Sequence, residues 1–438
     1  MRETPRGGAR RPGGTGLLVL GMLLALVVAG CPKDPPKPDP SASKTQDAGA
    51  VADVKPVAKE APGDVQHGTE LIKQFECNRC HERADGTAAT QPKDCVGCHA
   101  DIVEGKFKAA PESIAKWKPR VKDYVHAPSL VGLGDRVTRK FVEDYLLLPL
   151  DQRPHLAQSM PRLALTAKDA KDIAAAIVVR DEVLPADPMK APELAGADMG
   201  KGRQLLETKG CGSCHAFTGV APLAASAPPA MEPKAFAKAY ALAPDLRTSR
   251  TRSTPAKVIA WLLDPVAVKA DSAMPKIPLT KTEARDIAAY LLGAELGPVA
   301  AKPKPERLAV LTRKVTFAEV DEKVFHRSCW HCHSEPDYAI GDGGPGNSGG
   351  LGFKPRGLNL ASYQGVSAGM VDDKGERQSI FAKDAEGVPR LVRALLARHD
   401  EEAGGATGAV RGMPLGYPAL SAEEIQLVET WIAQGRPK

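Results

Sequence analysis

The sequence predicts a mainly α-helical protein, in which three similar helical units follow an unstructured N-terminal segment. The first observation is an apolar stripe at helical spacing, which occurs three times, each time after a Met-Pro pair and a Thr or Ser. The second is residues 31–65, which are rich in Pro, Ala, Lys and Asp and show no apolar periodicity. The third is an aromatic content of only 5%, which leaves little material for large cores.

The last helix of each unit has the same predicted start. The Thr or Ser stands where an N-cap belongs, and an acidic residue three positions later completes a capping box, with Asp as the poorer choice. The cap pairs are Thr166 with Asp169, Thr280 with Glu283, and Ser421 with Glu424. The stripe lies seven and eleven residues after each cap, at Ile173 and Ile177, Ile287 and Leu291, and Val428 and Ile432.

Other signals give the order and the bounds of the units. Apolar residues at helical spacing also open each unit, and a middle helix ends at Pro149 in the first, ends at Pro265 in the second and begins near Pro389 in the third. Pro- and Ala-rich joints lie between the units. The predicted units are residues 66–185, 198–296 and 307–438.

A five-residue pattern, C-x-x-C-H, occurs four times in the chain. Two cysteines three positions apart present both thiols along one edge of a flat macrocycle, and the adjoining histidine then lies beneath the metal as its proximal ligand. A single C-x-x-C could be a zinc site or a dithiol pair, but four copies that all carry the histidine favour four covalently attached c-type haems. The four sets are Cys77, Cys80 and His81; Cys95, Cys98 and His99; Cys211, Cys214 and His215; and Cys329, Cys332 and His333.

The ninth cysteine, Cys31, ends an N-terminal export signal in residues 1–30. Four arginines precede an apolar run over residues 17–29, which is too short for a comfortable membrane span. The end of the run resembles a bacterial lipoprotein signal, and this resemblance implies that Cys31 receives lipid and becomes the mature N-terminus. The alternative is a soluble export signal that is cut near Gly30. Residues 31–65 would then form a disordered tether.

The charge balance gives no reason to expect a nucleic-acid partner. The net charge is +6, and four arginines and one glutamate within residues 1–30 leave +3 for the remaining chain. Haem propionates would reduce it further. A lipid-anchored protein of the bacterial envelope that faces the periplasm is expected, and Lys33, two positions after Cys31, modestly favours the outer membrane.

A helix that runs into C-x-x-C-H, then a Pro-containing loop, Met-Pro and an amphipathic helix resemble the class I cytochrome c fold. The resemblance covers nearly all of residues 66–438, and the whole chain resembles multihaem cytochrome c lipoproteins of bacteria. In that family the Met before the last helix is the distal iron ligand, which implies Met274 opposite His215 and Met413 opposite His333. Family members also bond a Pro carbonyl to the proximal His, and Pro128 and Pro244 match that position.

The first unit departs from the family because it has two haem motifs and one Met-Pro. A helix precedes Cys77 but not Cys95, which favours Met160 as the ligand opposite His81. The spacing of 29 residues from His99 to Pro128 equals that from His215 to Pro244, and it favours the other haem. We expect Met160 to serve His81, with the second haem as an insertion.

The sixth ligand of the haem at His99 is not given by any pattern. Candidates in the first unit are His126, His67 and His155, and we prefer His126 because it stands next to the Pro128 loop. The third unit contains His326, His331 and His399, of which His399 is the substitute ligand should Met413 fail.

Two functions follow from these patterns. The first is electron transfer through four haems between redox partner proteins, and it fits a chain without a catalytic group beyond the cofactors. The protein would act as a carrier or as a subunit of a respiratory chain, and copurification with partners would distinguish the two. The alternative is a haem enzyme, peroxidase-like or oxidising sulfur compounds, with an open iron at His99. A glycine-rich run over residues 341–346 matches a dinucleotide-binding pattern, but no strand precedes it and no helix follows, so it predicts only a loop beside a haem.

Overall fold

The computed structural model describes most of the chain after residue 61. The described residues are 62–82, 84, 86–89, 93–150, 152–180, 182–224, 227–299, 303–335, 344–404 and 410–438. The predicted export signal, Cys31, nearly all of the tether and residues 341–343 lie outside them. Helices dominate the described residues, which confirms the mainly α prediction. None of these helices combines the length and the apolar character needed to cross a bilayer.

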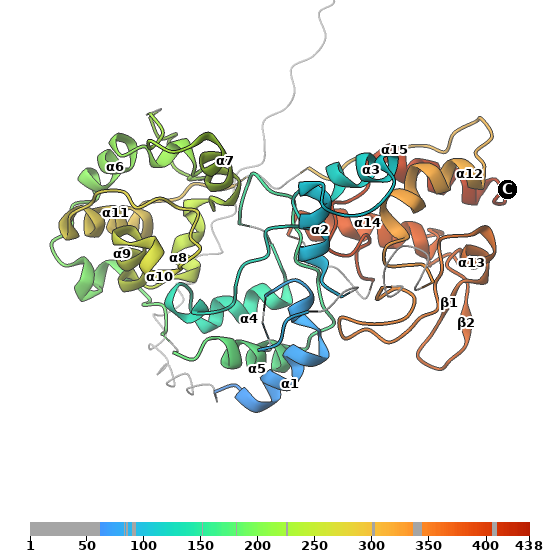
Figure 1. The fold of residues 1–438 in the computed structure, drawn as a ribbon, viewed down its shortest axis with the longest axis horizontal. Coiled ribbons are helices and arrows are strands. Elements are labelled where there is room, and N and C mark those ends of the chain that lie inside the picture. Colours follow the sequence, from blue (N-terminus) through green and yellow to red (C-terminus); the bar gives the residue numbers. More distant parts are fainter. Residues whose placement is uncertain are drawn as a thin grey trace, which may run out of the picture. The chain divides into compact units, whose positions relative to one another are not determined.

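The first segment, residues 62–180, holds its core between its first and last helices. Its elements are α1 (Val65–Gln74), η1 (Cys77–Arg79), α2 (Cys95–Glu104), α3 (Pro111–Val121), η2 (Leu133–Asp135), α4 (Arg139–Leu147) and α5 (Ala167–Ile177). Helices α1 and α4 both pack on α5 (Figure 1). Leu71 and Ile72 of α1 meet Ile173 of α5 in an apolar cluster. Helix α2 packs on α3 instead.

The second segment, residues 182–299, repeats this arrangement. Its elements are η3 (Pro188–Lys190), η4 (Pro192–Leu194), α6 (Met199–Thr208), η5 (Cys211–Ser213), α7 (Pro233–Leu242), η6 (Leu246–Thr248), α8 (Ser249–Arg252), α9 (Pro255–Leu263), α10 (Pro265–Val268) and α11 (Lys281–Gly293). Helices α6 and α9 pack on α11, as α1 and α4 pack on α5 (Figure 1). Leu205, Leu206 and Ile287 belong to a second apolar cluster.

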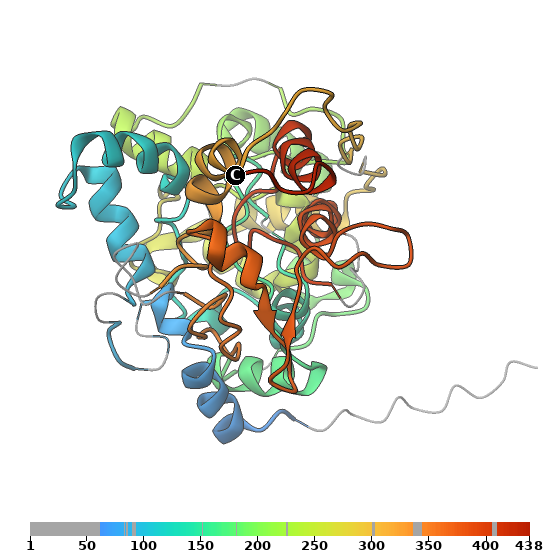
Figure 2. The same ribbon diagram turned by 90° about the vertical axis from the view of Figure 1, so that its right-hand side faces the viewer.

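The third segment, residues 303–438, has a different opening and an inserted hairpin. Its elements are α12 (Phe317–Val320), the π-helix η7 (Asp321–Cys329), α13 (Tyr363–Ala368), β1 (Met370–Val371), β2 (Arg377–Gln378), α14 (Arg390–Glu402) and α15 (Ala422–Ala433). Strands β1 and β2 pair antiparallel, and Figure 2 shows this orange hairpin toward the viewer. Helix α15 packs on α12, η7 and α14. A third apolar cluster surrounds the fully buried Trp431.

The crossings of α1 with α5 and of α6 with α11 each depend on a glycine. A Cβ at Gly68 would lie 2.0 Å from the Asp172 carbonyl oxygen, and a Cβ at Gly202 would lie 2.1 Å from the Asp286 carbonyl oxygen. No side chain fits at such distances. The carboxylates of the same two aspartates accept the N–H groups of Asp64 and Asp198, the caps of α1 and α6. The two crossings therefore share one design.

The predicted caps of the three last helices are all present. Thr166, Thr280 and Ser421 each accept the backbone N–H of the acidic residue three positions later, and the carboxylate of that residue accepts the N–H of the cap. Asp169 completes its box as fully as the two glutamates do. The capping boxes were therefore correctly predicted from the sequence.

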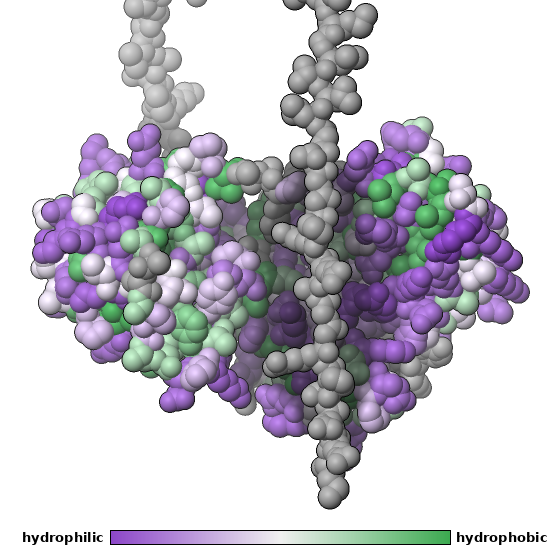
Figure 3. Space-filling model, turned by 90° about the horizontal axis from the view of Figure 1, so that it is seen from above, coloured by the Kyte–Doolittle hydropathy of each residue, from purple (hydrophilic) through white to green (hydrophobic). Residues whose placement is uncertain are grey.

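Direct contacts join the first segment to the other two. The Thr138 N–H donates to the Arg252 carbonyl at 2.8 Å, and Ser253 Oγ donates to the Arg136 carbonyl at 2.6 Å. Toward the third segment, the rings of Tyr124 and Tyr417 stack with centroids 4.3 Å apart. On the face presented in Figure 3, hydrophilic residues are interspersed with hydrophobic ones.

Candidate haem-binding sites

Two of the four motif histidines are oriented by a proline carbonyl. His215 Nδ1 donates to the Pro244 carbonyl oxygen at 2.8 Å, and His81 Nδ1 donates to the Pro128 carbonyl oxygen at 2.8 Å. A carbonyl only accepts, so the proton must lie on Nδ1, and the lone pair of Nε2 is left for a metal. The two prolines therefore have the role that the family resemblance implied. The Pro128 carbonyl binds His81, although the spacing between His99 and Pro128 had favoured His99 as its partner.

The cysteines of these two sites follow a helix directly. Helix α1 leads into η1 with Cys77, and α6 leads into η5 with Cys211. Both cysteines pack against the apolar cluster of their own segment. The covalent edge of a macrocycle attached here would therefore adjoin the core.

His333 lies against a loop that resembles the proline loops at His81 and His215, but in the described part of the chain it lacks their hydrogen bond to Nδ1. Burial lowers its pKa to about 4, and the Leu358 backbone acts in the opposite direction. Nδ1 of His333 has no partner with hydrogen-bond geometry among the described residues. Leu358 precedes Asn359 and Leu360 as Pro244 precedes Asp245 and Leu246, so it stands in the proline position. The Leu360 N–H donates to the His333 carbonyl at 2.7 Å and holds this loop against the motif.

The run over residues 341–346 is described only from Gly344 onward. The Gly346 N–H donates to the Cys332 carbonyl at 2.9 Å. A Cβ at Gly346 would lie 2.0 Å from the Cε1 atom of His333. This part of the run is thus a loop held close against the fourth motif.

His99 lies in different surroundings. Its motif opens α2 and does not follow a helix. The ring is 7% exposed, and burial lowers its pKa to about 4. The rings of Tyr124 and His99 meet edge to face, with their centroids 6.1 Å apart. The centroid of the His331 ring lies 6.0 Å from that of His99. Among the described residues, neither Cys95 nor Cys98 packs against an apolar cluster.

The chemical state of these residues fits haem attachment. The eight motif cysteines are free thiols, as addition to vinyl groups requires. Burial is the main cause that lowers the pKa of all four motif histidines, so each ring is held in the neutral form that binds a metal. These residues would hold haem c through two thioether bonds and one imidazole each.

The three predicted methionine ligands lie at three different cores. Met160, Met274 and Met413 are partly buried, and each packs against the apolar cluster of its own segment. Met160 and Cys77 pack against the same cluster, which is consistent with pairing Met160 with His81. The thioether of Met274 also accepts the indole N–H of Trp261 at 2.9 Å.

The other candidate histidines are engaged elsewhere. Burial lowers the pKa of His126, the charges of Arg153 and Lys238 lower it further, and its carbonyl accepts from Arg153 at 3.1 Å. His67 contacts Asp172 at 2.7 Å, the ring centroids of His155 and Tyr240 lie 3.8 Å apart in a stack, and His399 donates to the Leu420 carbonyl at 2.8 Å. His67 and His155 are thus engaged with side chains other than His99.

Cysteines of three motifs meet near one buried tyrosine. Burial raises the pKa of Tyr417, and the nearby thiols of Cys332, Cys95 and Cys80 raise it further. The side chains of Cys80 and Cys95 also lie within hydrogen-bond reach of each other. The first, second and fourth motifs therefore converge on Tyr417.

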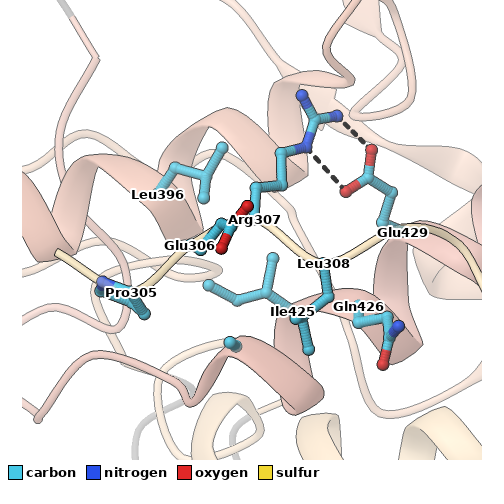
Figure 4. A pocket seen from close by; sticks show the side chains of 9 residues that line it. Pro305, Glu306, Arg307, Leu308, Leu396, Ile425, Gln426 and Glu429 are labelled. Atoms are coloured by element: carbon cyan, nitrogen blue, oxygen red, sulfur yellow. Dashed lines mark hydrogen bonds and ion pairs between the residues drawn. The ribbon is translucent and has the colours of Figure 1, made fainter. Parts of the chain in front are cut away.

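Two pockets lie away from the motifs. One is lined by Pro305 and Leu308 beside α14 and α15, where Arg307 forms a two-pronged ion pair with Glu429 (Figure 4). The other is an open depression of about 790 Å³ that includes Lys190 and Pro255. No motif residue lines either pocket.

Comparison with protein families identifies the second segment. Residues 199–295 match the family model described as Cytochrome c. These residues form a cytochrome c domain. The domain implies covalently bound haem c with its iron, and haem-based electron transfer as its general function. Neither the curated proteins nor the solved structures include a match to the chain.

Several residues around the cytochrome c domain and the other motifs were missed by sequence reasoning. Leu358 could have been found, because its Leu-Asn-Leu resembles the Pro-Asp-Leu after Pro244. Trp261 lies in the last turn of α9, the helix that was recognised from Pro265, but its bond to Met274 is a tertiary contact. Tyr417 and His331 carry no sequence signal for their positions.

Proposed function

We propose that this chain is a four-haem electron-transfer protein built from three tandem cytochrome c domains, the first with a second haem inserted. The observation that carries the proposal is one arrangement that occurs both in the first segment and within residues 199–295. A helix leads into a C-x-x-C-H motif, and a proline carbonyl accepts a hydrogen bond from the motif histidine. His81 with Pro128 and His215 with Pro244 have the same bond at the same 2.8 Å. Haem iron supplies one-electron chemistry when bound.

The residues around each motif have definable tasks in this function. The carbonyls of Pro128 and Pro244 fix the imidazole rings and raise their strength as ligands. Met160, Met274 and Met413 are the distal ligands, and a neutral, polarisable thioether favours the reduced metal relative to imidazole. The proposal requires only binding and electron exchange.

The convergence at Tyr417 supports exchange between three of the four sites. Cys80, Cys95 and Cys332 are attachment points for three macrocycles, and all three act on this one side chain. The cytochrome c domain at residues 199–295 would be the fourth site, in contact with the first segment through Arg252 and Ser253.

The cellular setting is part of the same proposal. Export by residues 1–30, lipid on Cys31 and the tether would hold the haem-bearing part at the periplasmic side of a bacterial membrane, with the outer membrane favoured. The partners would be redox proteins that donate and accept electrons. Recovery of the protein only in the inner-membrane fraction would reject the outer-membrane assignment.

Haem counting and low-temperature EPR of the air-oxidised protein test the function. Intact mass should show four haems, and all four should be low-spin if each iron has two protein ligands. A stoichiometric high-spin signal would contradict the carrier function and favour the alternative, a haem oxidoreductase with one open iron that acts on peroxide or sulfur compounds. A count below four would reject the tetrahaem assignment.

A further inference from the structure

The buried His99 ring faces a histidine from another haem motif. His331 stands between Cys329 and Cys332, and its ring centroid lies 6.0 Å from that of His99, with the ring planes inclined by 50°. The two residues come from the first and third segments, so the contact is long-range. His331 also acts electrostatically on His99.

The separation fits two imidazoles that share one metal. A metal–nitrogen bond of about 2 Å and about 1 Å from nitrogen to ring centre, taken on both sides, place the centroids about 6 Å apart. Direct stacking in this chain is much closer, as His155 on Tyr240 at 3.8 Å and His326 on Trp330 at 3.6 Å show. An edge-to-face pair also reaches such a distance, but the rings of His99 and His331 are inclined by only 50°, against 76° for the edge-to-face pair of His99 with Tyr124. The His331 ring is exposed, whereas that of His99 is buried.

The position of His331 in its own motif does not assign it to the macrocycle of that motif. In C-x-x-C-H the two cysteines and the last histidine serve one macrocycle, and the two middle residues do not. The other middle residue, Trp330, donates its indole N–H to Asp321 at 3.1 Å and stacks on His326.

Other contacts hold the same two segments together near this pair. Arg120 donates to Ser328 Oγ at 3.2 Å and lies 3.7 Å from a Glu424 carboxylate oxygen. Tyr124 stacks on Tyr417. The first and third segments are therefore held together by further contacts besides that of His331 with His99.

We propose that His331 is the distal iron ligand of the haem attached through Cys95 and Cys98, opposite His99. The inference rests on the proposed function, because it requires a haem on those cysteines. It replaces His126 in that role. Two imidazoles would give this iron the lowest reduction potential of the four. One iron would also cross-link the first and third segments.

The test compares three single variants of the haem-loaded protein. His331→Ala removes the proposed ligand, His126→Ala removes the candidate from the first segment, and His326→Ala is the matched control from the turn before the fourth motif. Peptide mass spectrometry first establishes whether the Cys95–Cys98 peptide carries haem. EPR and near-infrared magnetic circular dichroism then identify the axial ligands.

The wild-type protein should contain one bis-histidine haem and three histidine–methionine haems. In His331→Ala the bis-histidine signal should disappear and one high-spin haem should appear, and added imidazole should restore the low-spin state. His326→Ala and His126→Ala should retain the wild-type spectrum.

Three results would overturn the assignment. One is a wild-type protein without a bis-histidine haem, which needs no variant to fold. Another is the finding of four low-spin haems in His331→Ala, or the loss of the bis-histidine signal in His126→Ala instead. Both leave the four-haem function intact, whereas a Cys95–Cys98 peptide without haem overturns the four-haem function together with the ligand.

Discussion

The second segment and the first segment hold the same motif in different numbers and different surroundings. The second has one motif, one core and one proline carbonyl, and it matches the cytochrome c family model. The first repeats that site at His81 and adds His99, whose motif begins α2 and lacks both the preceding helix and the proline. A C-x-x-C-H motif can thus adjoin a core, or it can lie outside the cores and against a neighbouring segment.

Removal of the attachment cysteines should show the largest difference between these kinds of site. Cys211→Ala with Cys214→Ala should unfold the second segment, because the haem there completes a core that contains Leu205 and Ile287. The expected loss is comparable with the whole stability of a small domain, about 5–15 kcal/mol. Limited proteolysis and thermal unfolding followed by circular dichroism measure it.

The matched variant is Cys95→Ala with Cys98→Ala. It should also lose one haem by mass, yet α1, α4 and α5 should remain protected from protease, since neither cysteine packs against a core cluster among the described residues. Equal protease sensitivity of the first and second segments in the two variants would contradict the distinction.

A smaller loss of stability is expected from a change at the crossing of α6 with α11, which lies next to the His215 motif. Gly202→Ala would place a Cβ 2.1 Å from the Asp286 carbonyl oxygen and 3.0 Å from Tyr290 Cβ, so α6 must shift on α11. Overpacking of this kind costs about 1–3 kcal/mol. Urea unfolding followed by circular dichroism measures the free energy of unfolding.

Gly200→Ala in the same helix is the control. Its Cβ would meet only the Asp198 side chain, at 3.3 Å. The side chain of Asp198, the cap of α6, must move by a few tenths of an ångström, so the free energy of unfolding should change by no more than about 1 kcal/mol in either direction. A loss at position 200 as large as that at 202 would show that the crossing is not the cause.

The parts of this comparison that were predictable from the sequence are local. The caps at Thr166, Thr280 and Ser421 were found because a capping box spans four residues, and the motifs because they span five. The partner of Pro128 was ambiguous, because loop length does not determine which ring a carbonyl meets. The contact between His99 and His331 depends on how the first and third segments pack, which no spacing within either segment reports.

The crossing of α1 with α5 should also respond to acid. Burial of Asp172 raises its pKa, but bonds from Lys168, His67 and the Asp64 N–H outweigh this and lower it to about 2. A carboxylate with a lowered folded-state pKa stabilises the fold above about pH 4, its unfolded value, and loses this contribution as the pH falls toward 2. Asp172→Asn should cost about 1.5–3 kcal/mol at pH 7 and much less near pH 2.

Thermal unfolding of the wild type and of Asp172→Asn between pH 2 and pH 7 measures how the difference in stability between them shrinks as the pH falls. Glu70→Gln is a suitable control, because Glu70 is an exposed residue of α1 whose only polar contact among the described residues is with Gln66. It should follow the wild-type curve. Parallel curves for Asp172→Asn and the wild type would contradict the assignment of the lowered pKa to Asp172.

The smallest expected effect concerns the electronic tuning of the second segment. The Trp261 indole N–H donates to the Met274 thioether, which withdraws electron density from the sulfur. Trp261→Phe removes that bond and makes the sulfur a better donor to the oxidised metal, so the reduction potential of one haem should fall. A hydrogen bond worth about 1 kcal/mol corresponds to about 40 mV for one electron. Spectroelectrochemical titration should show one shifted component and three unchanged ones, and Trp117→Phe, on α3 of the first segment, should shift none. A rise in potential would contradict this effect of the hydrogen bond, and a shift in the most negative component would mean that Trp261 acts on another iron than that of the His215 motif.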